Sequence, residues 1–155
     1  MIPFLKRMES YLKFKYDKIV ADAGYESEEN YSYLEGNGQL AYIKPSNYEI
    51  SKTRKYKNDI IRIENMEYNE NGDYYICRNN KKLTVSHVIK RKSKTGYLSE
   101  KTIYTCEDCS NCSFKSSCIK GNNCKTPLED RTKNLETSKL FSRQRKDDLE
   151  RILSK

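Results

Sequence analysis

Four cysteines stand close together in the run CEDCSNCSFKSSC, with two, two and five residues between them. Packing of an ordinary hydrophobic core does not require so many thiols in so short a segment. Cysteines at two-residue gaps can turn their sulfur atoms onto one soft cation, and tetrahedral Zn²⁺ is the usual occupant. The spacing therefore predicts a metal site whose first candidate ligands are Cys106, Cys109, Cys112 and Cys118.

The identity of the ligands and of the metal stays open at this point. Cys77 could replace one of the four, because the sulfur of a β-hairpin can close a site whose other ligands are crowded. Cys124 is the last candidate. An iron–sulfur cluster is the alternative to zinc, although a ferredoxin-type run has a tighter fourth spacing and a following proline.

The composition favours a thin, aromatic core. Leu, Ile, Val and Phe are sparse over the 155 residues, near the composition at which chains fold poorly unaided. Thirteen tyrosines partly compensate, because each supplies an apolar ring with a polar end that tolerates water. We therefore expect a small core that a metal cross-links.

The charge balance favours a polyanionic partner. Thirty Lys and Arg against 22 Asp and Glu give a net charge of +8, which suits DNA. No apolar run approaches the roughly 20 residues needed to span a bilayer, so we expect no membrane partner. The start, MIPFLKRMES, lacks a signal-peptide pattern, and we expect a cytoplasmic protein whose cysteines hold metal rather than disulfides.

The first half of the chain predicts helices and strands in alternation, the order of an α/β sheet. Apolar periodicity and turn signals predict a helix over 3–16, a strand over 18–22, a helix from Ser27 to Gly36 or Gly38, and a strand over 40–44. Residues 46–65 are polar and basic. We expect them to connect the two halves, with a short helix near 58–64.

The second half predicts a small antiparallel meander followed by a charged helical tail. Turn signals at 71–72, 79–80 and 94–96 separate strand-like runs at 73–77, 83–89 and 97–104. The meander leads directly into the cysteine run.

The chain resembles bacterial insertion-sequence transposases in the run VADAGYESEENYSYLEGNGQLAYIKPSNYE and in the following SKTRKYKNDIIRIENMEY. These are enzymes of the DDE class on an RNase H-like fold, in a branch with a cysteine-bearing insertion between the second and third catalytic acids. That insertion is similar to YYICRNNKKL and YTCEDCSNCSFKSSCIK. The resemblance covers roughly residues 3–120 and weakens where Cys124 lies.

The resemblance implies that Asp22 is the second acid of a catalytic triad that holds two divalent ions such as Mg²⁺. Two metal ions about 4 Å apart would activate a water or a DNA 3′-hydroxyl and stabilise the leaving oxygen. It also implies DNA as the partner and an oligomer, as in transposases. Judged from periodicity alone, Asp22 would instead cap the loop before Gly24.

The other two acids of the triad are not found. Nothing in residues 1–17 matches the first, and the stretch Asn-Arg-Ser with a following Glu-Gly, which carries the third in the family, is missing. Glu150 lies in QRKDDLERILSK, which looks like the preceding helix. We therefore expect a fragment of α/β (α+β) class, inactive alone, with an incomplete RNase H-like core over 1–64, a cysteine-rich β insertion over 65–125 and a helical tail over 126–155.

A basic stretch is expected to contact DNA phosphates. Its residues are Lys81, Lys82, Lys90, Arg91, Lys92 and Lys94. Tyr97 and Tyr104 are interleaved with it and would stack on unpaired bases. The alternative is a solvated turn. His87, the only histidine, is expected to be structural.

Two functions from different classes fit these observations. The first is a DDE transposase fragment that descends from an enzyme of DNA strand cleavage and transfer. The alternative is a small zinc-dependent nucleic-acid-binding module.

Overall fold

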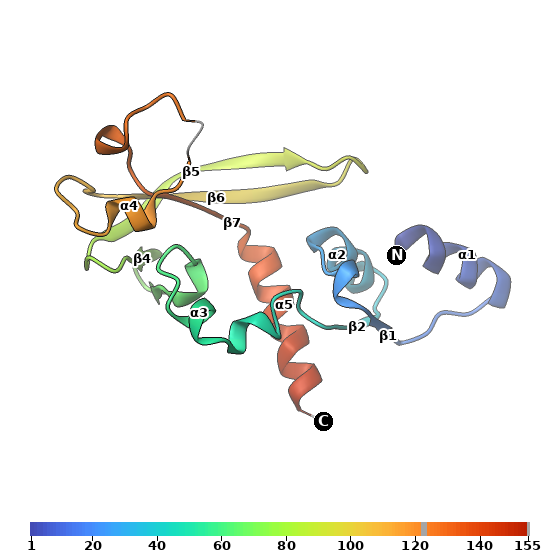
Figure 1. The fold of residues 1–155 in the computed structure, drawn as a ribbon. Coiled ribbons are helices and arrows are strands. Elements are labelled where there is room, and N and C mark those ends of the chain that lie inside the picture. Colours follow the sequence, from blue (N-terminus) through green and yellow to red (C-terminus); the bar gives the residue numbers. More distant parts are fainter. Residues whose placement is uncertain (122–123, 155) are drawn as a thin grey trace. The chain divides into compact units, whose positions relative to one another are not determined.

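The structure is a computed structural model that describes residues 1–121 and 124–154, and it divides into two compact units (Figure 1). The first unit consists of Met1–Ile50, Lys92–Ser99 and Ser138–Lys155. The second consists of Ser51–Arg91 and Glu100–Thr137. These units do not coincide with the segments 1–64, 65–125 and 126–155 that the sequence predicts, because 51–64 groups with the second unit and the tail helix with the first.

The first unit is built on two parallel strands with helices packed against them. Its elements are α1 (Ile2–Leu12), β1 (Lys18–Ala21), the 3₁₀ helix η1 (Ala23–Tyr25), α2 (Glu28–Gly36), β2 (Leu40–Ile43) and α5 (Lys139–Leu153). Lys18 pairs with Leu40 and Ala21 with Ile43. The predicted alternation of helix and strand is confirmed. Of the tail predicted to be helical over 126–155, only Lys139–Leu153 forms an α-helix.

Local chemistry sets the ends of α2. The Ser27 hydroxyl accepts the N–H of Asn30, which satisfies one of the free donors at the helix start. Glu28 and Glu29 in the first turn favour the positive end of the helix dipole. Gly38 takes a φ of 68°, the left-handed conformation that glycine adopts without strain, and the chain turns into β2.

Helix α1 is shorter than predicted. Its last residue is Leu12, because Lys13 adopts a left-handed conformation and donates its N–H to the Glu9 carbonyl. Phe14 therefore lies outside the helix and packs its ring edge-on against Tyr16.

The core of the first unit is small and includes one aromatic ring. Side chains from α1, both strands and α2 form it, and Phe141 of α5 packs against it. The buried residues are Leu5, Ile19, Tyr31, Leu34, Ala41 and Ile43.

The loop at 92–99 belongs to this unit because it is bonded to α2. The Thr95 hydroxyl donates a hydrogen bond to the Glu29 carboxylate at 2.6 Å. The Tyr97 hydroxyl donates to Glu28 at 3.2 Å and lies 2.9 Å from the Ser32 hydroxyl.

The second unit is a five-stranded sheet in the order β3-β4-β5-β6-β7. Its strands are β3 (Glu67–Asn69), β4 (Tyr74–Ile76), β5 (Lys82–Lys92), β6 (Leu98–Cys106) and β7 (Asn134–Thr137). The ends of β5 and β6 next to their connecting turn fall in the first unit. The pairs β3–β4, β4–β5 and β6–β7 are antiparallel. The three predicted strands are confirmed, whereas the sequence analysis missed β3 and β7.

Short helices fill the connections of this unit. They are η2 (Ile50–Lys52), which begins at the unit boundary, α3 (Arg54–Lys57), η3 (Ile63–Asn65), α4 (Lys115–Cys118) and η4 (Leu128–Asp130). The short helix predicted near 58–64 is present only at its end, where η3 begins at Ile63, and residues 58–62 are not helical. The Thr53 hydroxyl accepts the N–H of Tyr56 and starts the helical turn earlier, at Arg54.

The core of the second unit joins strand residues to a cysteine. Leu83, Tyr104, Cys106 and Leu135 are buried together. The Tyr75 ring packs edge-on against Tyr104, with ring centres 5.0 Å apart, and its centre lies 4.6 Å from that of the tilted Tyr68 ring. The fold is thus of mixed helix and strand (α+β) class.

No described residue belongs to a helix long and apolar enough to cross a membrane.

Candidate functional sites at a sheet edge and in a cysteine cavity

Asp22 lies where the sequence predicts, directly after β1 at the carboxyl edge of the parallel pair. Its side chain is exposed and accepts the N–H of Ala23, so it caps η1. This contact is the loop-capping role expected from periodicity alone. A carboxylate at such an edge also stands where open α/β sheets present ligand-binding groups.

A buried acid, Glu26, connects the loops next to Asp22 at the carboxyl edge of the parallel strands. The side chain of Glu26 is only 3% exposed, and its carboxylate accepts the N–H of Ser46 at 2.7 Å. The guanidinium of Arg145 on α5 pairs with the same carboxylate at 2.5 Å and donates to Asn47. The loops that follow β1 and β2 are therefore both tied to α5.

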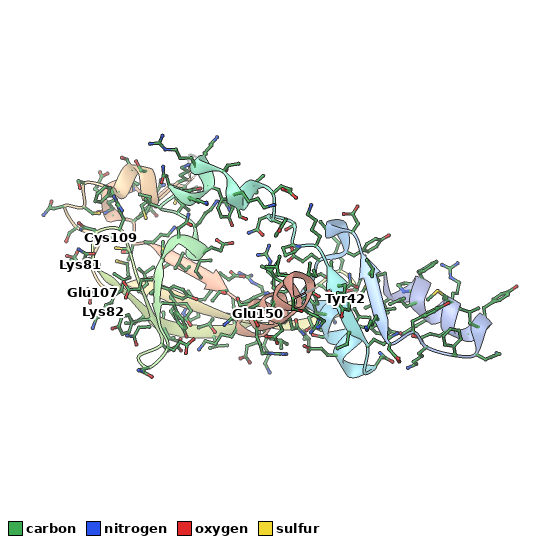
Figure 2. The ribbon with its side chains drawn as sticks, turned by 90° about the horizontal axis from the view of Figure 1, so that it is seen from below. Tyr42, Lys81, Lys82, Glu107, Cys109 and Glu150 are labelled. Carbon is green, nitrogen blue, oxygen red and sulfur yellow. The ribbon has the colours of Figure 1, made fainter. Side chains whose placement is uncertain are left out.

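Helix α5 carries one exposed and one buried acid close together. Glu150, which is labelled in Figure 2, is an exposed residue, whereas Asp148 is 1% exposed. One Asp148 oxygen accepts the N–H of Ile43 at 2.9 Å and the Tyr31 hydroxyl at 3.0 Å. Arg151 donates to the other oxygen at 3.2 Å.

Burial raises the pKa of Asp148 above its ordinary value, although the hydrogen bonds from Ile43 and Tyr31 and the charge of Arg151 act in the opposite direction. The sequence analysis missed this residue. A signal existed, because Asp148 stands seven residues after Phe141 and four before Ile152, on the helix face of the predicted apolar residues.

The structure does not bring a set of acids to Asp22. Within residues 1–121 and 124–154, no three His, Cys, Asp or Glu side chains stand in an arrangement ready to hold a metal ion. The described residues therefore do not complete a two-metal site for Mg²⁺.

The cysteines, by contrast, do come together. A cavity of about 20 Å³ in the second unit is lined by five of the six cysteine side chains. They are Cys77, Cys106, Cys109, Cys112 and Cys118. Since no three of them stand ready to coordinate, the thiols face one space without forming a closed coordination sphere.

Backbone groups contact two of the sulfur atoms. The N–H of Lys133 donates to Cys109 Sγ at 3.4 Å, and the Cys106 thiol donates to the Asp108 carbonyl at 3.4 Å. Burial raises the pKa of Cys106 to about 12. Burial also raises the pKa of Cys118, with nearby thiols in the same direction and Lys133 in the opposite one.

Cys124 does not line this cavity. It is exposed, and hydrogen bonds from Thr126 lower the pKa of its thiol.

The predicted DNA-contacting residues fall in both units. Lys81, Lys82, Lys90 and Arg91 belong to the second unit, and Lys92 and Lys94 to the first. All are exposed except Lys81, which is half-buried and lies 3.8 Å from the Asp108 carboxylate. Arg91 pairs with Glu136 at 3.0 Å.

One end of β5 in the second unit combines basic side chains with the cysteine loop. Figure 2 shows Lys81, Lys82, Glu107 and Cys109 close together. The N–H of Lys82 donates to the Glu107 carboxylate at 3.1 Å, and the Glu107 N–H donates to the Lys82 carbonyl at 2.9 Å.

Tyr104 cannot stack on DNA bases, and that prediction is wrong. Its ring is fully buried, and its hydroxyl donates to Asp73 at 2.7 Å. Tyr97 is half-buried against α2 through Glu28 and Ser32. His87 is exposed on β5, with its Nδ1 3.0 Å from the Ser86 hydroxyl.

Comparison with known protein families identifies a domain in the second half of the chain. The family model described as "Transposase DDE domain" matches residues 76–155, just over half of the chain. The chain belongs to the transposase DDE-domain family. Neither the curated proteins nor the solved structures compared with the chain give a match.

The residues matched by the transposase family model include all six cysteines and helix α5. Asp22 lies before it, so its catalytic role rests on the resemblance of the surrounding run and on its place at the sheet edge.

Proposed function

We propose that this chain is a DDE-class transposase polypeptide whose parent activity is metal-dependent cleavage and transfer of DNA strands. The observation that carries the proposal is the family match over residues 76–155. Family membership also supports DNA as the partner. An oligomeric transposase assembly in the bacterial cytoplasm belongs to the same proposal.

The architecture of the first unit supports an RNase H-like core. Two parallel strands, a helix between them and a further helix, α5, packed on β2 are parts expected of such a fold. Asp22 then takes the role of one catalytic acid at the carboxyl edge. The cysteine-rich sheet of the second unit takes the role of the family's insertion.

We further propose that the chain is catalytically inactive alone. Two-metal chemistry needs several carboxylates to fix both ions against the scissile phosphate. Asp22 is exposed and bonded to its own loop, and the part of the chain that the structure describes adds no second acid to it. With a single carboxylate, Mg²⁺ would keep most of its water.

This proposal predicts no nicking or strand transfer on supercoiled plasmid DNA with either Mg²⁺ or Mn²⁺. Asp22→Ala should give the same result as the unchanged chain in a gel assay for nicked product. Metal-dependent nicking that disappears in Asp22→Ala would contradict it. The next step would then be to replace Glu64, Glu67, Asp73 and Glu150 one at a time.

A second candidate function is a small zinc-dependent nucleic-acid-binding module. It is favoured by the second unit, which has its own core, contains the cysteine cavity and carries exposed basic residues on β5. Sequencing the DNA that flanks the gene separates the two functions. Coding sequence for the other two catalytic acids would favour the transposase, and its lack would favour the module.

A further inference from the structure

Five thiols line the cysteine cavity of the second unit, and the fold indicates which four of them can act as metal ligands. The spacing in the sequence predicts four metal ligands, Cys106, Cys109, Cys112 and Cys118, with Cys77 as a possible replacement for one of them. A tetrahedral thiolate site needs four of them, so one thiol serves another purpose.

Cys106 is the thiol that the fold uses for packing. Thr102, Tyr104 and Cys106 alternate along β6 and are all buried, which places them in one inward-facing row of the sheet. Cys106 is 4% exposed and lies in the core with Leu83 and Leu135. Its N–H donates to the Lys133 carbonyl at 2.9 Å, so the strand pairing extends to this residue.

The other four cysteines stand in turns and at the end of a short helix. Cys77 follows β4 in a tight turn, in which its N–H donates to the Lys81 carbonyl at 2.9 Å. Cys109 and Cys112 lie in the loop after β6, and Cys118 is the last residue of α4. All four are half-buried at the same cavity, where rotation about one side-chain bond can redirect a sulfur atom.

The charges around the cavity match a thiolate site. Arg78, Lys115 and Lys133 line it together with one acid, Asp108. Lys133 is buried, and its ammonium donates to the carbonyls of Ile61 and Cys118 at 3.4 Å. Four thiolates around one Zn²⁺ carry a net double negative charge, which these cations would offset.

We infer that Cys77, Cys109, Cys112 and Cys118 hold one Zn²⁺, and that Cys106 is a core residue rather than a ligand. Each of the four thiols loses its proton on binding. The metal would join the turn after β4 to the loop after β6, two segments that lie far apart in sequence. This inference does not depend on the proposed DNA chemistry.

The experiment compares Cys77→Ser with Cys106→Ala in the full chain, purified under reducing conditions. The unchanged chain and Cys106→Ala should each contain about one zinc per chain by elemental analysis. Cys77→Ser should lose zinc affinity by more than the roughly 10–100-fold that loss of an outer-shell partner costs. Cobalt substitution should give the same tetrahedral thiolate spectrum in the unchanged chain and in Cys106→Ala.

The unchanged protein supplies a second measurement that does not require a folded variant. Alkylation followed by mass spectrometry should label Cys124 in the zinc-loaded chain. After chelation it should also label the four ligands, and Cys106 should react last. Zinc loss in Cys106→Ala but not in Cys77→Ser, labelling of Cys106 ahead of the four proposed ligands after chelation, iron with visible absorbance, or no metal in freshly reduced protein would each overturn the inference.

Discussion

At the residue scale, the most consequential side chain of the first unit is the buried carboxylate of Asp148. It joins three elements, because β2 supplies the N–H of Ile43, α2 supplies the Tyr31 hydroxyl and α5 carries the acid itself. Arg151 reaches past it to the Ala41 carbonyl at 2.6 Å. The neighbouring Asp147 instead forms a surface pair with Arg143 at 3.1 Å.

Asp148→Ala should therefore lower the free energy of unfolding by about 2–4 kcal/mol, because two buried donors lose their acceptor. Asp147→Ala, the matched control, should change it by less than about 1 kcal/mol, since it removes only a surface pair. Urea denaturation followed by circular dichroism measures both. Equal effects of the two substitutions would show that the buried network does not stabilise the fold.

The raised pKa of Asp148 gives this residue a pH signature. Its contribution to stability is fully present below the ordinary value of 3.8 and decreases as pH rises through the raised pKa of the folded chain. The side chain of Asp148→Asn does not titrate. Its stability deficit relative to the unchanged chain should therefore shrink as the pH rises above 3.8, and a deficit that grows would contradict the direction of the shift.

At the scale of elements, one turn residue ties several strands of the second unit together. Asp73 stands between β3 and β4 at a φ of 49°, and its carboxylate accepts the hydroxyls of Tyr68 and Tyr104 at 2.8 and 2.7 Å. Tyr104 lies on β6, so the acid links the β3–β4 turn to a strand further across the sheet. Burial and the bond to Asp73 raise the pKa of Tyr68 to about 12.

Asp73→Ala should cost about 2–4 kcal/mol of unfolding free energy, because it removes both acceptor bonds and adds strain at a left-handed position. Tyr104→Phe should cost about 1 kcal/mol, and Tyr68→Phe less, since Tyr68 is 39% exposed. Thermal or urea denaturation measures the unfolding free energies of the three variants and so gives the order of their costs. A cost for Tyr68→Phe that exceeds the cost for Tyr104→Phe would contradict the assignment of burial.

At the scale of the whole molecule, the excess of basic residues predicts weak binding to DNA without sequence preference. The net charge is +8, and most of the candidate phosphate contacts are exposed. If about four phosphates are contacted, affinity should fall by about 10²-fold between roughly 50 and 200 mM salt. Fluorescence anisotropy with labelled duplexes of two unrelated sequences measures this.

Two pairs of charge-reversal variants test whether DNA contacts the surface of β5 or is attracted only by the net charge of the chain. Lys82→Glu with Lys90→Glu should weaken binding more than Lys55→Glu with Lys57→Glu, although both pairs change the net charge equally and all four lysines belong to the second unit. Equal losses would remove β5 from the proposed DNA contact. Binding that is absent at low salt, or insensitive to salt, would remove DNA contact by the basic residues altogether.

The sequence by itself determined the elements whose signals are local. Ser27 starts α2 through its own hydroxyl, the short apolar runs form β1 and β2, and the glycine at 38 ends a helix because only a few neighbouring residues decide these features. The spacing of the cysteines likewise predicts that they come together, because four of them lie within one short segment.

Only the tertiary structure decided features that depend on residues distant in sequence. The polar segment Asn134–Thr137 becomes a strand because β6 offers it a partner, and no local pattern marks it. Cys77 joins the cavity of the later cysteines, and Tyr104 is buried rather than exposed, because the sheet brings β4, β6 and the loop after β6 together. Asp148 is polar in sequence yet buried in the fold, since its partners on α2 and β2 stand more than 100 residues earlier.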